Sequence, residues 1–179
     1  MRMLVMIALL LAVALVALLA TRPDRFHVER SATIDAPSAT VFSHIDDFHR
    51  WTAWSPWEKI DPQLQRSYDG PPSGVGAGYR WSGNSQVGEG SMRITESVPG
   101  RKVGIALEFI TPFRASNVAT FTLAPEGSGT RVTWAMDGRN NFVAKAIGLF
   151  MNMDTMVGGQ FEQGLASLKG IAEGGSGAL

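Results

Sequence analysis

The chain of 179 residues is long enough for one domain of ordinary size. Hydrophobic residues make up 45% of it and charged residues 18%, which is typical of a folded protein and not of a disordered one. The 16 basic residues balance the 16 acidic ones and cysteine is absent, which argues against nucleic acid as a partner and excludes disulfides, thiolate catalysis and cysteine-held metal centres.

The first segment, residues 3–20, contains no charged residue and is rich in Leu, Ala and Val. As a helix rising about 1.5 Å per residue it extends roughly 27 Å, near the thickness of a bilayer's hydrocarbon core. A cleaved signal peptide is the alternative, but its apolar core is shorter, and Leu18 fits its small-residue cleavage site poorly. We expect residues 1–21 to anchor the protein by a single span, and basic residues on both flanks leave the side of the membrane undecided.

After a linker at residues 22–25, apolar and polar residues alternate from Phe26 to Asp35, which predicts a half-buried strand. Pro37 then opens a short helix. Its apolar residues at helical spacing are Val41, Phe42, Ile45 and Phe48. The irregular stretch that follows contains three tryptophans, which either close the core or lie at a membrane interface. They are Trp51, Trp54 and Trp57.

Further strand-like runs follow, separated by Gly, Pro and Asn turns. They cover residues 64–68, 79–81, 87–96, 103–109, 117–123 and 132–136. The short loops predict an antiparallel meander. Residues 142–172 are predicted to form one long helix, and residues 174–179 a flexible tail. The sequence therefore predicts an α+β fold, in which a curved antiparallel sheet of about six or seven strands wraps around a long C-terminal helix.

Several short motifs occur in the order of these elements. They are Ile34-Asp35-Ala36-Pro37, Val41-Phe42, Asp47-Phe48, Trp51-x-x-Trp54-Ser55-Pro56-Trp57, Gly88-Glu89-Gly90, Met153-Asp154 with Met156, and Phe161-Glu162-x-Gly164-Leu165-x-x-Leu168-Lys169. As a set they resemble the polyketide cyclase/dehydrase branch of the START-related SRPBCC superfamily. The resemblance implies a helix-grip domain over residues 26–173, with an apolar cavity for a lipid, quinone, polyketide or similar molecule. It implies no single chemistry, and the N-terminal anchor departs from the soluble aromatase/cyclase enzymes.

The concave face of the sheet is where a ligand pocket is expected, although aromatic and Met stripes are more often core packing. The candidate ligand-binding residues are Tyr79, Trp81, Met92, Ile105, Leu107, Phe109, Asn117, Phe121, Trp134, Met136 and, on the helix, Phe161. Asn117 is the polar residue on a strand face that is otherwise apolar. Its buried amide needs a partner, either a backbone group or a ligand carbonyl.

Candidate catalytic groups are few. Glu89 lies between two glycines, but its parity is opposite to that of Met92 and Ile94, so it faces solvent unless a bulge turns it inward. Arg30 is expected to reach solvent or a carboxylate such as Glu108.

The histidines give no metal-binding pattern, because His44 and His49 do not share a helix face, and the glycine-rich stretches lack nucleotide-binding spacing. We expect no metal and no cofactor. Each of four glycines in the long helix lowers helix stability by about 0.8–1 kcal/mol relative to alanine. We expect this cost to be offset by close contact with the sheet, by a bound ligand or by a role of the helix as a lid. The four glycines are Gly158, Gly159, Gly164 and Gly170.

The leading hypothesis is a membrane-anchored domain that binds an apolar small molecule, with the bilayer as partner through residues 3–20. An enzyme of the cyclase, dehydratase or hydrolase type, with Glu89 or Asn117 as polar participant, is one alternative. A protein-interaction module without ligand is another. The sequence leaves the ligand and the oligomeric state open.

Overall fold

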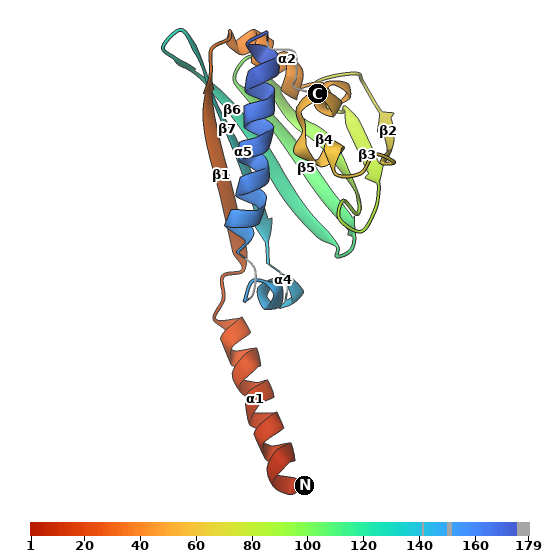
Figure 1. Cartoon of the computed structure of the whole chain (residues 1–179), viewed down its shortest axis with the longest axis vertical. Coiled ribbons are helices and arrows are strands. Elements are labelled where there is room, and N and C mark those ends of the chain that lie inside the picture. The colour runs from red at the N-terminus through yellow and green to blue at the C-terminus, as the bar shows by residue number, and fades with distance from the viewer. Residues whose placement is uncertain (141, 150–151, 175–179) are drawn as a thin grey trace.

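The computed structural model describes residues 1–140, 142–149 and 152–174, drawn in Figure 1. The elements in chain order are α1 (Arg2–Ala20), β1 (Arg25–Ile34), α2 (Ser38–Ile45), the 3-10 turn η1 (Phe48–Arg50), α3 (Trp51–Trp54), the 3-10 turn η2 (Pro56–Lys59), β2 (Gln65–Asp69), β3 (Gly78–Ser82), β4 (Glu89–Val98), β5 (Lys102–Thr111), β6 (Ala115–Glu126), β7 (Gly129–Arg139), α4 (Phe142–Ile147) and α5 (Met153–Ala172). The tail was predicted at residues 174–179, and its residues after Gly174 lie outside the described part of the chain.

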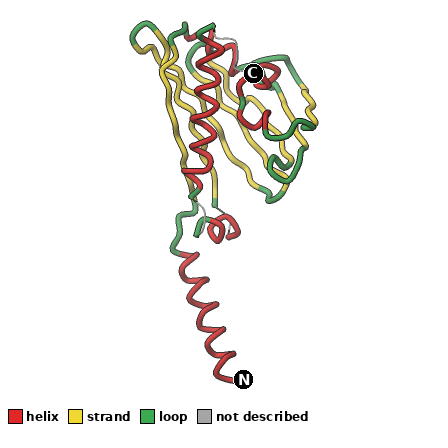
Figure 2. The backbone as a smooth tube through the Cα atoms, in the orientation of Figure 1, coloured by secondary structure: helices red, strands yellow, loops and turns green. Residues whose placement is uncertain are grey.

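The strands form one sheet in the order β1-β7-β6-β5-β4-β3-β2, and every neighbouring pair is antiparallel. The sheet curves around α5, which lies across its concave face (Figure 2). Each strand has one apolar parity, and α5 turns Phe161, Leu165 and Leu168 toward it, all at most 2% exposed. The predicted α+β helix-grip architecture is confirmed.

The predicted single helix over residues 142–172 was wrong, because the structure has two helices there. α4 ends at Ile147 and α5 begins at Met153. Asn152 caps the start of α5: its side-chain oxygen accepts the backbone N–H groups of Asp154 and Thr155 at 3.0 and 3.3 Å. An N-cap residue has non-helical backbone angles, so it ends any continuation from α4.

The tryptophan cluster belongs to the core and not to a membrane interface. Trp51 and Trp54 are 4% and 0% exposed, and their indole N–H groups donate to backbone carbonyls of α2. The Trp54 ring lies 5.6 Å from that of Trp134, and Trp57, which is half-buried, lies at the same distance from it. These rings fill the space between the sheet and α5 next to α2.

Sheet contact accounts for two of the four helix glycines. A Cβ on Gly158 would clash with the guanidinium of Arg30, and a Cβ on Gly164 would lie 2.8 Å from the Trp134 ring. At Gly159 and Gly170 it would meet no described atom within 4 Å. Gly164 therefore needs glycine for close packing against a buried ring, whereas a side chain at Gly158 would displace the flexible end of Arg30.

Arg30 binds carboxylates, which was one of the two expected alternatives, but they are not Glu108. Its guanidinium donates to Asp154 at 2.8 Å and to Glu162 at 2.7 Å, both on α5. The side chain is 25% exposed, and the two carboxylates, which raise the pKa of Arg30, hold it over Gly158. Arg30 thus ties β1 to the first half of α5 instead of reaching solvent or Glu108.

Candidate ligand-binding site

The inner face of the sheet is filled with side chains near α2. Phe121 lies 4.7 Å from Trp134, and Trp134 stacks on Phe161 with ring centroids 4.2 Å apart and planes 9° apart. The three are at most 2% exposed. These predicted ligand-binding residues are therefore brought together, but they pack against one another. We name this the closed end; it comprises α2, α3 and the aromatic rings beneath them.

Other predicted residues extend across β3, β4 and β5. Tyr79 and Trp81 are stacked with centroids 6.0 Å apart, and the Trp81 ring meets that of Phe109 at 5.8 Å. Ile105, Leu107 and Met136 are buried in the same core, whereas Met92 and Phe109 are half-buried.

The hydroxyl of Tyr79 has a protein partner that the sequence did not indicate. It donates to Glu58 at 2.6 Å, and the other oxygen of Glu58 accepts from Arg66 at 2.5 Å. Burial and then the bond to Glu58 raise the pKa of Tyr79 above its ordinary range. Since both oxygens of the buried Glu58 carboxylate are engaged, this network ties η2 to the strands β2 and β3.

Asn117 has an unpartnered acceptor. The residue is 8% exposed, and its side-chain oxygen, which is buried, has no hydrogen-bond partner among the described residues. The backbone partner considered for this amide does not reach that oxygen. Any Cβ on Gly138 would clash with both the Asn117 oxygen and the Phe26 ring, so the two side chains meet over this glycine. A buried acceptor left without a donor costs about 1–3 kcal/mol.

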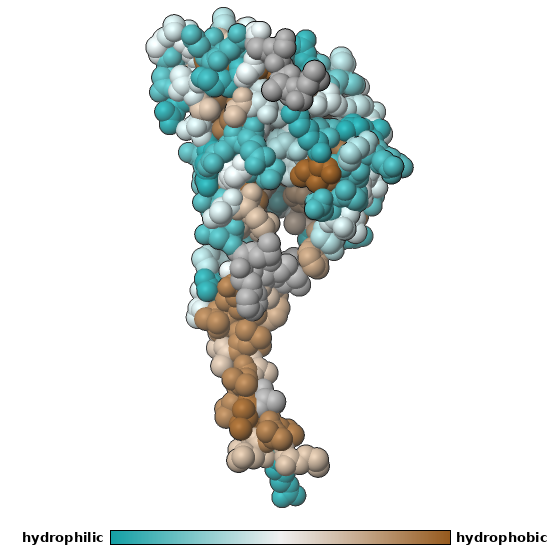
Figure 3. Space-filling model, viewed as in Figure 1, coloured by the Kyte–Doolittle hydropathy of each residue, from teal (hydrophilic) through white to brown (hydrophobic). Residues whose placement is uncertain are grey.

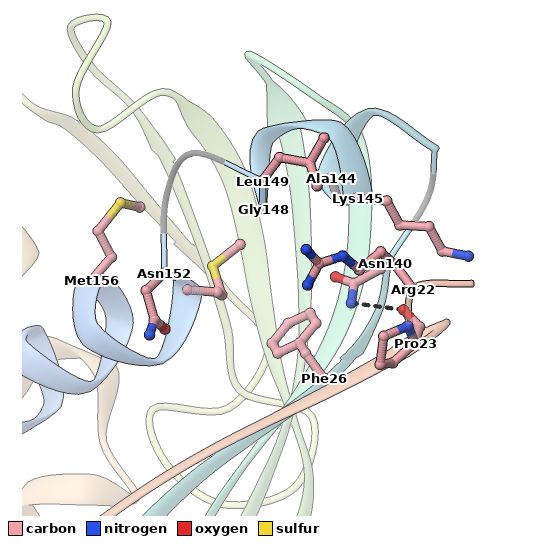
Figure 4. A pocket seen from close by; sticks show the side chains of 11 residues that line it. Arg22, Pro23, Phe26, Asn140, Ala144, Lys145, Gly148, Leu149, Asn152 and Met156 are labelled. Atoms are coloured by element: carbon pink, nitrogen blue, oxygen red, sulfur yellow. Dashed lines mark hydrogen bonds between the residues drawn. The ribbon is translucent and has the colours of Figure 1, made fainter. Parts of the chain in front are cut away.

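A pocket of about 500 Å³ lies directly beyond Phe26, between the start of β1 and the two C-terminal helices (Figure 4). It is lined by Arg22, Pro23, Phe26, Asn140, Ala144, Lys145, Gly148, Leu149, Asn152, Met153 and Met156. The α1–β1 linker forms one wall, and Asn140 holds it by donating its side-chain N–H to the Pro23 carbonyl at 3.2 Å. We name this part of the domain, together with the neighbouring β5–β6 hairpin, the open end.

None of the residues that line this pocket was among the predicted site residues. The helix break that creates it could have been found from Gly148 followed by Asn152, since glycine and asparagine favour helix ends. A second, shallower depression of about 770 Å³ follows the end of the sheet and shares Asn140 with the first. The predicted residue Phe109 lines it.

The polar candidates outside the sheet face do not assemble into a catalytic or metal site. A register shift does occur between Glu89 and Gly90, yet Glu89 stays exposed. His49 donates its backbone N–H to Asp47 and stacks on Tyr68 at 4.0 Å. In the part of the chain that the structure describes, no three His, Cys, Asp or Glu side chains are placed to hold a metal ion.

Solved structures share this fold at low sequence identity. CV1439 from Chromobacterium violaceum is 18% identical with a TM-score of 0.60, over 85% of this chain and 99% of that one. The Aha1 dimer of Colwellia psychrerythraea is 16% identical with a TM-score of 0.56, again over 85% and 99%. DynU16, from the dynemicin biosynthetic locus, is 16% identical with a TM-score of 0.57, over 87% of this chain and 49% of that one.

A comparison with curated proteins gave no match. A family model described as "Polyketide cyclase / dehydrase and lipid transport" matches residues 25–173. The match covers the whole sheet, the aromatic closed end and all of α5. The chain therefore belongs to this SRPBCC-type family.

Proposed function

We propose that the protein is a membrane-anchored binding domain for an apolar small molecule, of lipid, quinone or polyketide-like character. In this proposal α1 holds the domain at a bilayer, and the pocket at the open end receives the ligand. The family supports a hydrophobic ligand, because its description includes lipid transport.

The observation that carries the proposal is the position of the pocket beside the end of α1. Arg22 and Pro23, which follow α1, form one wall, while Phe26, Leu149 and Met153 supply apolar surface. An apolar ligand is concentrated in the bilayer, so a pocket next to the anchor meets it where it is abundant. Methionine side chains at such a site adapt to ligands of different shape.

The surface of α1 supports the anchor. Among the described residues, Arg2–Ala20 is the one helix long and apolar enough to span a bilayer, and 6% of its span is buried. Figure 3 shows its hydrophobic surface projecting away from a largely hydrophilic domain. A core helix of a soluble protein would be covered. A signal peptide has similar properties, and the mass of the mature chain distinguishes the two.

Asn117 supports a ligand with a polar group. Its unpartnered oxygen does not line the pocket but lies beside Phe26, which does, so a ligand group reaches it when the Phe26 ring moves aside. An oxygen acceptor requires a donor, so a hydroxyl or N–H group of the ligand fits this position better than a carbonyl. The enzyme alternative has less support, because Glu89 is exposed and both oxygens of Glu58 are already bonded.

Native mass spectrometry of the full-length chain, released from detergent, tests the binding function. We expect an apolar molecule to be retained in stoichiometric amount. Leu149→Asp places a charge in the pocket wall and should reduce retention at least about tenfold, equivalent to about 1.4 kcal/mol. Val75→Asp, at an exposed loop position remote from the pocket, is the matched control. Equal retention by the two variants, or no retained molecule in the parent protein, would contradict the proposal.

Carbonate extraction of native membranes tests the anchor separately. We expect the chain in the pellet at its full mass. A shortened, soluble chain that begins near Thr21 would show that the N-terminal segment is a signal peptide.

A further inference from the structure

We infer that the open end of the domain lies flat against an anionic bilayer through a docking rim. The rim consists of exposed residues from the α1–β1 linker, the β5–β6 hairpin, the end of β7 and α4. They are Arg22, Arg25, Ile110, Phe113, Arg114, Arg139 and Phe142. This inference rests on the proposed anchor but goes beyond it, because α1 alone fixes the position of the domain and not its orientation.

The topology brings these segments to one end of the sheet. Arg25 of β1 pairs with Arg139 of β7, Gly138 of β7 pairs with Asn117 of β6, and Ala115 of β6 pairs with Phe109 of β5. The β5–β6 hairpin, the end of the α1–β1 linker and the start of the β7–α4 connection therefore lie at the same end of the sheet. Figure 1 shows α4 at this same end, next to the last turn of α1. Leu19, in that turn, is 1% exposed, so α1 is packed against the domain where it ends.

Large apolar side chains of the rim are exposed to solvent. Ile110 is 45% exposed, Phe113 53% and Phe142 58%. They come from two segments: α4, which lines the pocket, and the β5–β6 hairpin, which lines the neighbouring depression. Apolar and aromatic groups at the level where an anchor leaves the hydrocarbon are stabilised by contact with the bilayer interface.

The cations of the rim are available to lipid phosphates. Arg22, Arg25, Arg114 and Arg139 are exposed, and none forms an ion pair within 4 Å with a described residue. Arg139 is near enough to Asp24 to contribute, after Lys145, to lowering the pKa of that carboxyl. The acidic groups at this end have partners of their own: Asp24 pairs with Lys145, and Glu108 accepts the Ser116 hydroxyl at 2.6 Å. Glu89 lies within 3.5 Å of the Thr111 hydroxyl. An anionic surface therefore complements the rim.

Docking through the rim has a consequence for the pocket. The pocket lies between α4 and the α1–β1 linker, both of which contribute to the rim. With the rim on the bilayer, the pocket lies beside the headgroups, and an apolar ligand has a short path between membrane and pocket.

The absence of cysteine allows a direct test by single-site labelling. The full-length chain carrying Phe113→Cys is labelled with the environment-sensitive fluorophore NBD and reconstituted into vesicles of phosphatidylcholine with phosphatidylglycerol. The matched control is Val75→Cys, since Val75 is 60% exposed in the β2–β3 loop at the opposite end of the sheet. We expect a blue shift of emission and quenching by doxyl-labelled lipids at position 113, and neither at position 75.

Flotation of the same vesicles separates the anchor from the rim. If the protein floats with the vesicles but the label at position 113 stays in water, the docking rim is overturned and the anchor is retained. The exposed rim would then be assigned to contact with a protein partner or a second copy of the chain. Failure of the protein to float would overturn both.

Arg114→Glu with Arg139→Glu, in the Phe113→Cys background, tests the role of charge. We expect the blue shift to be lost while flotation and the circular dichroism spectrum are unchanged. An undiminished blue shift would overturn the assignment of an anionic surface.

Discussion

The closed and open ends of this domain use the same sheet and the same helix in opposite ways. At the closed end, Trp54, Trp134 and Phe161 are at most 2% exposed and their rings are in direct contact. At the open end, Met156 is 48% exposed, Phe26 is half-buried and a pocket separates α4 from the start of β1. The difference teaches that tight packing is concentrated at one end of the sheet, whereas the other end keeps a pocket.

Helix α5 itself reflects this division. In the middle of α5, Phe161 and Gly164 contact the Trp134 ring closely. The turns before Phe161 are held by the ion pair of Arg30 with Asp154, and Arg30 forms a second ion pair with Glu162. Close aromatic packing tolerates little displacement, whereas partly exposed ion pairs can lengthen at small cost. We therefore expect any opening that admits a ligand to begin at the start of α5.

The largest expected effect comes from Phe161→Ala at the closed end. Removing this fully buried ring should lower the free energy of unfolding by about 3–5 kcal/mol, because it leaves a cavity beneath Trp134. Met156→Ala, on the same helix, should cost much less, since about half of its side chain is already in water. Chemical denaturation of the two variants measures the difference, and equal losses would erase the distinction between the ends.

Smaller changes in stability, opposite in sign to each other, are expected when two glycines of α5 are replaced by alanine. Gly164→Ala places a methyl group 2.8 Å from Trp134 and 3.1 Å from Pro56, and should destabilise the protein by about 1–3 kcal/mol. Gly159→Ala meets no described atom within 4 Å and should stabilise it by up to about 1 kcal/mol through helix propensity. Thermal melts compare the two, and a loss of stability in Gly159→Ala would mean that this helix surface is covered by something else.

The smallest effect is a pH dependence that differs between the ends. Burial, with a smaller contribution from the charge of Arg50, lowers the pKa of His44 in α2. The unfolded chain therefore binds the proton more readily, and the stability contributed by neutral His44 falls as the pH drops below about 6.5. At the open end, the hydrogen bond to Asp137 raises the pKa of His27. Its contribution is present at acid pH and is lost as the pH rises through that raised value.

Denaturation at pH 5.5 and pH 8 tests these signs with glutamine substitutions. His44→Gln should lose less stability than the parent protein on acidification, and His27→Gln should lose more. The same response from both variants would contradict the opposite pKa shifts of the two histidines.

The fold could be predicted because its signals are local. Alternation along β1, β5, β6 and β7 and the apolar stripe of α5 depend on neighbours within a few residues. The break between α4 and α5 was missed because apolar residues continue across it and hide the cap at Asn152. The partners of Arg30 could not be predicted either, because they lie 124 and 132 residues away on α5.

The candidate site was less predictable than the fold. Parity correctly assigned residues such as Trp134 and Phe121 to the inner face, but it cannot tell a filled face from a hollow one. The pocket depends on where α4 turns back beside the linker, which is a property of three-dimensional shape. Whether Asn117 finds a partner depends likewise on the backbone of β7 opposite it.

The short connection between α1 and β1 determines how far the domain can travel. It comprises residues 21–24, and four extended residues span at most ~14 Å. With α1 in a bilayer, the domain stays beside that bilayer and meets the ligands dissolved in it by lateral diffusion. Such confinement raises the effective concentration of a dilute lipid-soluble ligand. Delivery to another membrane would therefore need a second carrier that collects the ligand from this one.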